Sequence, residues 1–234
     1  MGAIYKRELN SYFNSAIAYI VMAVFFGFSA YFFVGTCFMG NTASLAYTFS
    51  NMFIILIFLT PILTMKSFSE EKRQRTDQAL LTSPASLGEI VMGKYLSAMT
   101  LYGICCGIFL VYGLIITFFV VPEWSVILCT LLGFFLLGGA LIAIDIFISA
   151  LTESQVIAAV VSVAVGIVIY LMSSITSMIE AQWLVDFLNT ISFTTYFANF
   201  TYGLLDVQGI VYFASVIALF NFLTVRVFEK RRWG

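Results

Sequence analysis

Residues 66–94, KSFSEEKRQRTDQALLTSPASLGEIVMGK, form the longest polar segment of a chain otherwise dominated by apolar runs. This segment holds five of the eleven basic residues, and the other six lie within residues 6–7 and 226–232. Lys and Arg are retained on the cytoplasmic side of a membrane during insertion. The three basic groups therefore mark cytoplasmic segments, and the apolar runs between them are expected to cross the membrane in pairs.

The composition is that of a membrane protein. The chain of 234 residues is 62% hydrophobic and only 10% charged, whereas a soluble domain carries about 25% charged residues. No polar block is long enough to form a separate soluble domain. We therefore expect a single transmembrane domain over residues 1–234, with membrane lipid as its surroundings and no nucleic acid as a partner.

Six apolar runs are long enough to span the bilayer, because a helix of about 20 residues crosses the roughly 30 Å hydrocarbon layer. Six crossings leave both termini on the cytoplasmic side, together with all eleven basic residues. The sequence thus predicts an all-α polytopic membrane protein whose spans cover approximately residues 16–38, 46–65, 95–121, 125–150, 155–179 and 207–228.

Two further segments favour the membrane interface. Residues 3–15 mix aromatic and charged positions, which is typical of a short helix lying in the interface; an ordinary charged flank of the first span is the alternative. Residues 180–206 are rich in aromatic residues, too apolar for a solvated loop and too interrupted for a span. We expect an outer re-entrant or interfacial hairpin there.

The polar segment 66–94 is predicted to be a helix–turn–helix elbow at the inner membrane surface. Residues 69–81 contain few helix breakers, and Pro84 disfavours helix in the residue before it. Ser86 followed by Glu89 is a capping-box pattern that starts a second helix. A solvated connector is the alternative, but such a connector could have been much shorter.

Several catalytic chemistries are disfavoured. Residues 88–95 match seven positions of the phosphate-loop pattern, but Tyr95 stands where that loop needs the short hydroxyl side chain of Ser or Thr for Mg²⁺, and no strand precedes it. The four cysteines lack metal-ligand spacing, and the chain has no histidine. We therefore expect this chain to bind no ATP, metal or other cofactor, and to have no hydrolase site.

Asp145 is the one carboxylate inside a predicted span. Burying its charge costs about 2.5–3.5 kcal/mol on the insertion scale, so such a residue is a functional candidate by default. The alternative is structural, because Asp145 lies four residues from Ser149, near enough to the inner interface to be hydrated or paired. A proton relay would need further partners. We therefore keep Asp145 as a candidate intramembrane polar site.

Segments from both ends and the middle of the chain resemble one family. Their order and spacing are similar to those of the permease subunits of ABC-2 type exporters, in particular the gliding-motility-type branch of bacterial ABC permeases. The segments are YKREL (5–9) with Tyr12 and Phe13, SFSEEKRQ (67–74), LLTSP (80–84), GK (93–94), SALTESQ (149–155), Phe197, Phe200, Gly203, Asp206 and RRW (231–233).

The resemblance implies a membrane subunit of the bacterial cytoplasmic membrane that exports a substrate by alternating access. It implies a separate ABC ATPase subunit that carries ATP and Mg²⁺, and a second permease chain, in a homodimer or a heterodimer. The resemblance also implies an extracytoplasmic accessory protein as a further partner. The elbow resembles a first coupling helix and residues 152–153 a second contact, so the predicted ATPase-coupling residues are Glu70, Glu71, Lys72, Arg73, Arg75, Leu80, Leu81, Thr82, Ser83, Pro84, Thr152 and Glu153.

The sequence departs from the family pattern at a few positions, and two other functions stay open. The family usually has glycine where Arg75 stands and a small residue at Asp145. The first alternative is a self-sufficient secondary transporter or channel that uses Asp145. The second is a non-transporting membrane anchor of an envelope assembly.

Overall fold

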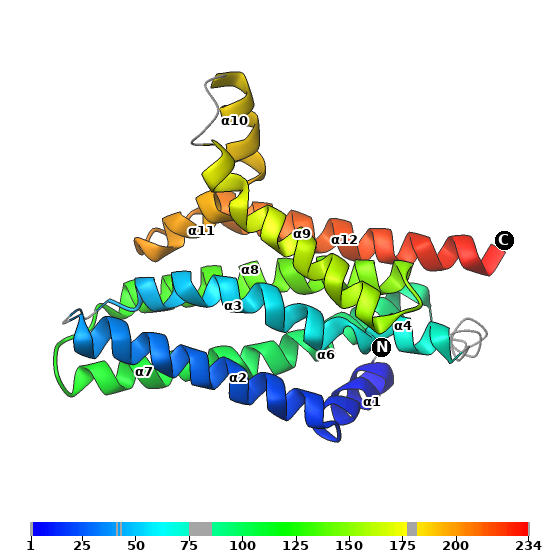
Figure 1. Ribbon diagram of the computed structural model, residues 1–234, viewed down its shortest axis with the longest axis horizontal. Coiled ribbons are helices and arrows are strands. Elements are labelled where there is room, and N and C mark those ends of the chain that lie inside the picture. The colour runs from blue at the N-terminus through cyan, green and yellow to red at the C-terminus, as the bar shows by residue number, and fades with distance from the viewer. Residues whose placement is uncertain (1, 41, 43, 75–85, 177–181, 234) are drawn as a thin grey trace.

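The computed structural model describes residues 2–40, 42, 44–74, 86–176 and 182–233. Every regular element among them is a helix, and six helices are long and apolar enough to cross a membrane (Figure 1). This confirms the predicted fold class. The six candidate spans are Ala16–Met39, Ala46–Arg73, Leu87–Thr117, Trp124–Leu151, Gln155–Thr176 and Val207–Lys230.

Some spans contain more than one helical element. The first half of the chain forms α1 (Gly2–Phe13), α2 (Ala16–Phe33), the π-helix η1 (Val34–Met39), α3 (Ala46–Thr64), α4 (Lys66–Arg73), α6 (Leu87–Cys106) and α7 (Ile108–Thr117). The second half forms α8 (Trp124–Leu151), α9 (Gln155–Thr176), α10 (Gln182–Ile191), α11 (Phe193–Thr201) and α12 (Val207–Trp233).

Helix α8 is the centre of the bundle and packs against α3, α6, α9, α11 and α12. Its glycines allow the neighbouring helices to come close. A side chain at Gly138 would overlap the Tyr102 ring of α6, and one at Gly133 would lie 2.5 Å from Phe200 of α11. The Tyr102 hydroxyl also donates to the Phe134 carbonyl, at 2.7 Å. Small residues and one buried hydrogen bond thus fix α8 between its neighbours.

The third span is interrupted at Gly107, between α6 and α7. The Gly107 amide donates to the Gly103 and Ile104 carbonyls, which closes the end of α6. At Gly103 an added Cβ would lie 3.3 Å from the Phe135 ring of α8. The G-x-x-x-G pair therefore marks a helix break and a close helix contact within one span.

The segment expected as an outer hairpin contains two helices in its described part, α10 and α11. Figure 1 shows α10 standing away from the bundle, while α11 lies along it. Helix α11 is tied to α8 by the Thr130 hydroxyl, which donates to the Phe200 carbonyl at 3.0 Å. It ends at Thr201, and Gly203 follows in the turn with a φ of 77°, in the left-handed region that favours glycine. The re-entrant or interfacial placement of this segment stays a prediction.

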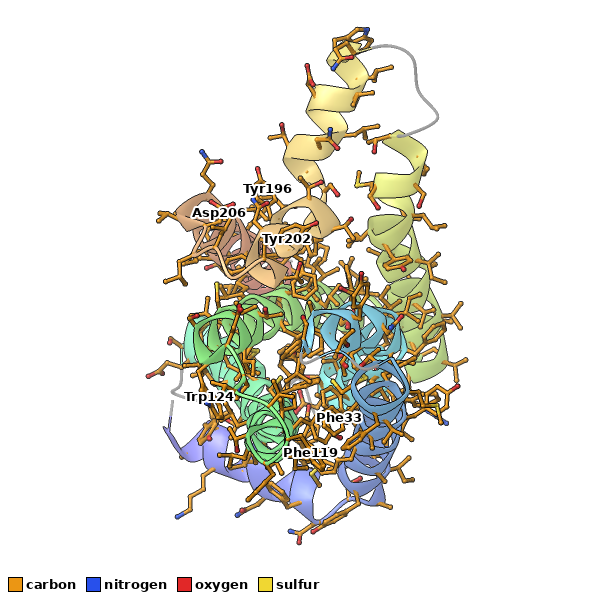
Figure 2. All side chains as sticks on the ribbon, turned by 90° about the vertical axis from the view of Figure 1, so that its left-hand side faces the viewer. Phe33, Phe119, Trp124, Tyr196, Tyr202 and Asp206 are labelled. Atoms are coloured by element: carbon orange, nitrogen blue, oxygen red, sulfur yellow. The ribbon has the colours of Figure 1, made fainter. Side chains whose placement is uncertain are left out.

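The turn between α11 and α12 is held by Asp206. Its carboxylate accepts from the Asn199 side-chain amide at 2.7 Å and from the Gln208 amide at 2.9 Å. These bonds hold the pKa of Asp206 below its usual range, the Asn199 bond being the largest cause. Figure 2 looks onto this end of the bundle, with Asp206 beside Tyr196 and Tyr202 above, and with Trp124, Phe33 and Phe119 below.

The opposite end carries the described basic residues and is called the elbow end. It contains α1, α4, the start of α6, the end of α8 and the end of α12, and both chain termini lie on that side (Figure 1). The described basic residues belong to these elements: Lys6, Arg7, Lys66, Lys72, Arg73, Lys94, Arg226, Lys230, Arg231 and Arg232. The folded chain thus gathers at one end the three groups that are separated in the sequence.

Candidate functional site

The elbow helix α4 is amphipathic and lies with one face on the bundle. Ser67, Phe68, Ser69 and Lys72 are buried, whereas Arg73 is exposed. The buried residues recur at the spacing of one helical face. Helix α4, the first described part of the predicted elbow, packs chiefly against α8 and is therefore part of the bundle.

The start of α4 is capped by a residue from another helix. Ser149 of α8 accepts hydrogen bonds from the Phe68 and Ser69 amides, each at 3.2 Å, and donates to the Met65 carbonyl at 3.2 Å. The first amides of a helix lack partners within that helix. One hydroxyl therefore satisfies backbone groups at the junction of α3 and α4 and fixes α4 to α8.

Lys72 holds the other end of α4. Its side chain is 6% exposed, and its ammonium group donates to the Ala150 carbonyl near the end of α8. The sequence interpretation placed Lys72 among the residues that contact an ATPase. In the structure Lys72 points into the bundle, so its part in such a contact stays a prediction, and its observed contact is structural.

Lys94 of α6 is the most deeply buried charge at the elbow end among the residues that the structure describes. It is 2% exposed, and its ammonium group lies 2.7 Å from the Ser67 carbonyl and 2.8 Å from Glu71 Oε1. Glu8 Oε1 of α1 lies at 3.3 Å, and the Phe68 ring centroid at 4.9 Å. One ammonium group thus joins α1, α4 and α6.

Arg7 completes this group, which we call the Lys94 cluster: Arg7, Glu8, Glu71 and Lys94. The Arg7 guanidinium lies 2.6 Å from Glu8 and 3.5 Å from Glu71. Its hydrogen bond with Glu8 is the main cause that raises the pKa of Arg7. The cluster has two positive and two negative charges. Its formal charge is therefore balanced, which buried charges require.

Helix α1 packs directly on α6 beside the cluster. At Gly93 an added Cβ would lie 3.0 Å from Ile4 Cγ2 and 3.4 Å from the Tyr5 amide nitrogen. The Tyr5 and Thr100 hydroxyls are 3.0 Å apart, and the Tyr12 hydroxyl donates to the Leu63 carbonyl of α3 at 3.3 Å. The glycine–lysine pair that resembled a phosphate loop therefore has a structural use. Gly93 leaves room for α1 to pack closely on α6, and Lys94 binds the carboxylate of Glu8 on α1.

The predicted second contact lies at the same end. The Thr152 hydroxyl donates to the Ile148 carbonyl at 3.3 Å, and Glu153 is exposed between α8 and α9. Because Lys72 bonds to Ala150, this turn lies beside α4. The structure thus brings together the two segments that the sequence assigned to one partner.

The exposed charges differ from the buried ones. Arg73 is exposed, and Glu70 is half-buried and accepts from Gln74 at 3.3 Å. These residues, with Glu153, are open to a partner at the elbow end. The other predicted coupling residues, Arg75, Leu80, Leu81, Thr82, Ser83 and Pro84, lie outside the described residues.

The capping box at the start of α6 is confirmed. Glu89 donates its amide to the Ser86 hydroxyl at 3.3 Å, and its carboxylate accepts from the Ser86 amide at 3.1 Å. Helix α6 therefore begins at Leu87, where the sequence pattern placed it. The contributions of Glu8, Lys94 and Ser149 to the elbow were not predicted, since they come from helices far apart in the sequence.

Asp145 is buried within α8, at 3% exposure. The Thr60 hydroxyl of α3 and the Ser162 hydroxyl of α9 are the side chains that interact with its carboxyl group. The sequence alternatives were a functional polar site and a structural residue that is hydrated or paired near the inner interface. The structure encloses the residue between three helices, and its role stays a prediction.

A comparison with known protein families identifies the family of this chain. The sequence profile described as "ABC-2 family transporter protein" matches residues 38–226, which is most of the chain. The chain belongs to the ABC-2 transporter family. This family is a non-catalytic membrane component of transporters, and the ABC-2 protein described here is a multi-pass membrane protein. A comparison with curated proteins gives no match.

Proposed function

We propose that this ABC-2 protein is the permease subunit of an exporter of the cytoplasmic membrane, driven by a separate ATPase. The ATPase carries ATP and Mg²⁺, and a second permease chain completes the membrane part. The family match supports the transporter role. The quoted segments support the gliding-motility-type branch, an elbow end on the cytoplasmic side, and an extracytoplasmic accessory protein as a further partner.

The observation that carries this proposal is the construction of the elbow. A partner that binds the exposed side of α4 acts on a helix whose inner side is bonded to α1, α6 and α8. Movement of the ATPase would therefore move the bundle and not a loose loop. Alternating access by rocking of helix bundles needs no catalytic residue in the membrane.

The test is co-purification with the candidate ATPase, most directly the product of a neighbouring gene. Arg73→Glu, Glu70→Lys and Glu153→Lys reverse the charges that face outward, and we expect each to weaken the complex and its ATP hydrolysis. Arg226→Glu is the matched control, because Arg226 is exposed at the same end but pairs with Glu229 on α12, at 2.7 Å. A complex that survives all three reversals intact would show that the coupling assignment is wrong.

Asp145, a buried carboxyl group inside a span, favours testing a second function, that of a self-sufficient secondary transporter or channel. That function predicts ion-driven flux by the isolated chain in vesicles, abolished by Asp145→Asn. Absence of flux dismisses it. A membrane anchor for an envelope assembly is the remaining alternative, and it predicts complex ATPase activity that responds to no candidate cargo.

A further inference from the structure

The buried carboxyl group of Asp145 has few hydrogen-bond partners. The carboxyl group is 3% exposed, and its Oδ2 atom is buried without a hydrogen-bond partner. The hydroxyls of Thr60 and Ser162 are the side-chain groups that interact with it. A carboxylate accepts about four hydrogen bonds, so an ionised Asp145 would leave most of its acceptor capacity unused in a buried place.

The Thr60 hydroxyl donates its proton within α3, to the Leu56 carbonyl at 3.0 Å. A hydroxyl has one proton and two acceptor lone pairs, so in this arrangement the Thr60 oxygen faces Asp145 as an acceptor. The contact between the two side chains is a hydrogen bond only if Asp145 carries a proton to donate.

The buried charged groups on the elements around α8 are engaged elsewhere. On α4 and α6, Lys72 donates to the Ala150 carbonyl and Lys94 is held by Glu71 and the Ser67 carbonyl. The described residues of α3, α7, α9 and α11 include no Asp, Glu, Lys or Arg. The remaining titratable groups of these elements are Lys66, Glu70, Arg73, Glu89, Arg226, Glu229, Lys230, Arg231 and Arg232 at the elbow end, the Tyr95 hydroxyl on the Gly139 carbonyl, and Tyr47, Tyr102, Cys105, Cys106, Tyr112, Tyr170, Tyr196 and Tyr212.

Asp145 lies at the middle of the seam that holds α9. Of the described residues of α9, only Ala158, Ser162 and Gly166 are buried, and they follow one another at four-residue steps along one face. An added Cβ at Gly166 would lie 2.7 Å from Ile57 Cγ2 of α3. Ser162, the central residue of the seam, meets Asp145. The seam is therefore narrow, and it has a buried acid at its centre.

We propose that Asp145 is a proton-binding site that latches α9 to α3 and α8 when its carboxyl group is protonated. The neutral acid donates to Thr60 and accepts from Ser162, and so bridges the three helices. Loss of the proton to water leaves a carboxylate that gives up its bond to Thr60 and has no cation beside it among the described residues. Release of α9 then becomes favourable, because it lets water from the nearby elbow end hydrate the charge.

Proton exchange would need only a short path. Asp145 is six residues before Leu151, where α8 ends, so it lies about 9 Å from the elbow end at 1.5 Å per residue. Displacement of α9 would open this distance to water. The linkage follows from mass action: whatever raises the fraction of ionised Asp145 lowers the fraction of docked α9.

Infrared difference spectroscopy of the purified chain in lipid tests the protonation directly. The spectrum of wild type minus Asp145→Asn is expected to show the carbonyl band of a neutral carboxyl group at neutral pH. Thr60→Val removes the acceptor at nearly constant shape and should shift that band, while Ser29→Ala, which removes a buried hydroxyl bonded to Tyr112, should not. A carboxylate band in place of the carbonyl band, or a band unmoved by Thr60→Val, would overturn the proposal.

A disulfide between α3 and α9 tests the latch. An added Cβ at Gly166 would lie 3.4 Å from Ile57 Cβ, close to the mean of about 3.8 Å between disulfide-bonded cysteines. The pair Ile57→Cys and Gly166→Cys, in a chain whose native cysteines are replaced, should cross-link when α9 is docked. The rate is compared at each pH between Asp145 and Asp145→Asn backgrounds, which cancels the titration of the thiols.

The asparagine amide donates and accepts like the neutral acid but does not ionise. We expect equal cross-linking rates at low pH, and a rate ratio that falls by up to about tenfold per pH unit once Asp145 ionises. A ratio that stays at one across the pH range would show that α9 docking is not linked to the proton. Both tests use the chain alone, so their outcome is independent of any ATPase.

Discussion

The elbow helix α4 and the span α9 both pack against α8, but through joints of different kinds. Helix α4 is joined by directional bonds to the hydroxyl of Ser149, the carbonyl of Ala150 and the ammonium group of Lys94. Helix α9 is joined by three small residues, by the Tyr170 ring against Phe53 of α3, and by Asp145. The first joint resists displacement in several directions, whereas the second has a single polar latch.

Helices α8 and α9 also show that the hydropathy of a span does not determine how much of it is buried in the bundle. The most apolar stretches of α8 and α9 are equally apolar, yet 72% of that stretch is buried in α8 and only 17% in α9. Burial inside the bundle is thus set by glycines and polar contacts, and not by apolar content. We infer that α4 moves with the bundle and that α9 is the span free to move against it.

The largest loss of stability is expected when the Lys94 cluster, which we also call the elbow joint, is disrupted. Lys94→Met removes the positive charge from between Glu8 and Glu71 and leaves two carboxylates close together. We expect a loss of about 3 kcal/mol in unfolding free energy, at the low end for a broken buried ion pair, because both carboxylates are partly exposed. Unfolding of the reconstituted chain measures it.

Lys66→Met is the control for that change, because Lys66 is an exposed lysine of the same elbow. It should leave the stability nearly unaltered. Equal losses in the two variants would contradict the assignment of the Lys94 cluster as the elbow joint.

A smaller loss is expected at the cap of α4. Ser149→Ala deprives the Phe68 and Ser69 amides of their acceptor, which should cost about 2 kcal/mol. Hydrogen exchange at these two amides should rise at the same time. Ser50→Ala removes a hydroxyl that bonds only within its own helix, to the Ala46 carbonyl, and serves as the control. Unchanged exchange in α4 would argue against the cap.

A substitution in the seam of α9 should cost less stability than the loss of the α4 cap. Gly166→Ala places a methyl group 2.7 Å from Ile57 Cγ2, which can shift, so we expect a loss of about 1 kcal/mol. Gly27→Ala has no atom within 4 Å of the added Cβ and should stabilise α2 slightly, since alanine favours helix. Thermal unfolding compares the two, and a stabilised Gly166→Ala would show that the seam is looser than described.

The smallest effect on stability is expected at the outward face of the elbow. Arg73→Glu should change the unfolding free energy by no more than about 0.5 kcal/mol, because Arg73 is exposed. The same variant should weaken binding of the ATPase. A binding loss that is matched by a loss of stability would place Arg73 in the elbow joint instead of the partner contact.

Much of the fold follows from local sequence. The six apolar runs predict the six spans, and the Ser86–Glu89 pair predicts the start of α6 within one residue. The helix that starts at this pair was expected to run into span three, and α6 does so, because the polar turn of the capped helix is continuous with the apolar residues of the span. Charge position predicted the elbow end, since Lys and Arg stay at one face.

The joints could not be predicted in the same way. Glu8, Glu71 and Lys94 are brought together across as many as 86 residues of chain, and no local pattern encodes such pairing. The inward orientation of Lys72 and the enclosure of Asp145 depend on which face of each helix meets α8. Apolar content leaves that face undetermined when nearly every position is hydrophobic.

Two disulfide locks test the contrast between a fixed elbow and a movable α9 most directly. Ile4→Cys with Gly93→Cys would lock α1 to α6 beside the Lys94 cluster, where an added Cβ lies 3.3 Å from Ile4 Cβ. Ile57→Cys with Gly166→Cys would lock α9. In the purified complex with its ATPase, the account predicts that ATP hydrolysis survives the first lock and is inhibited by the second, and that reduction reverses this inhibition. Inhibition by the first lock together with full activity under the second would contradict it.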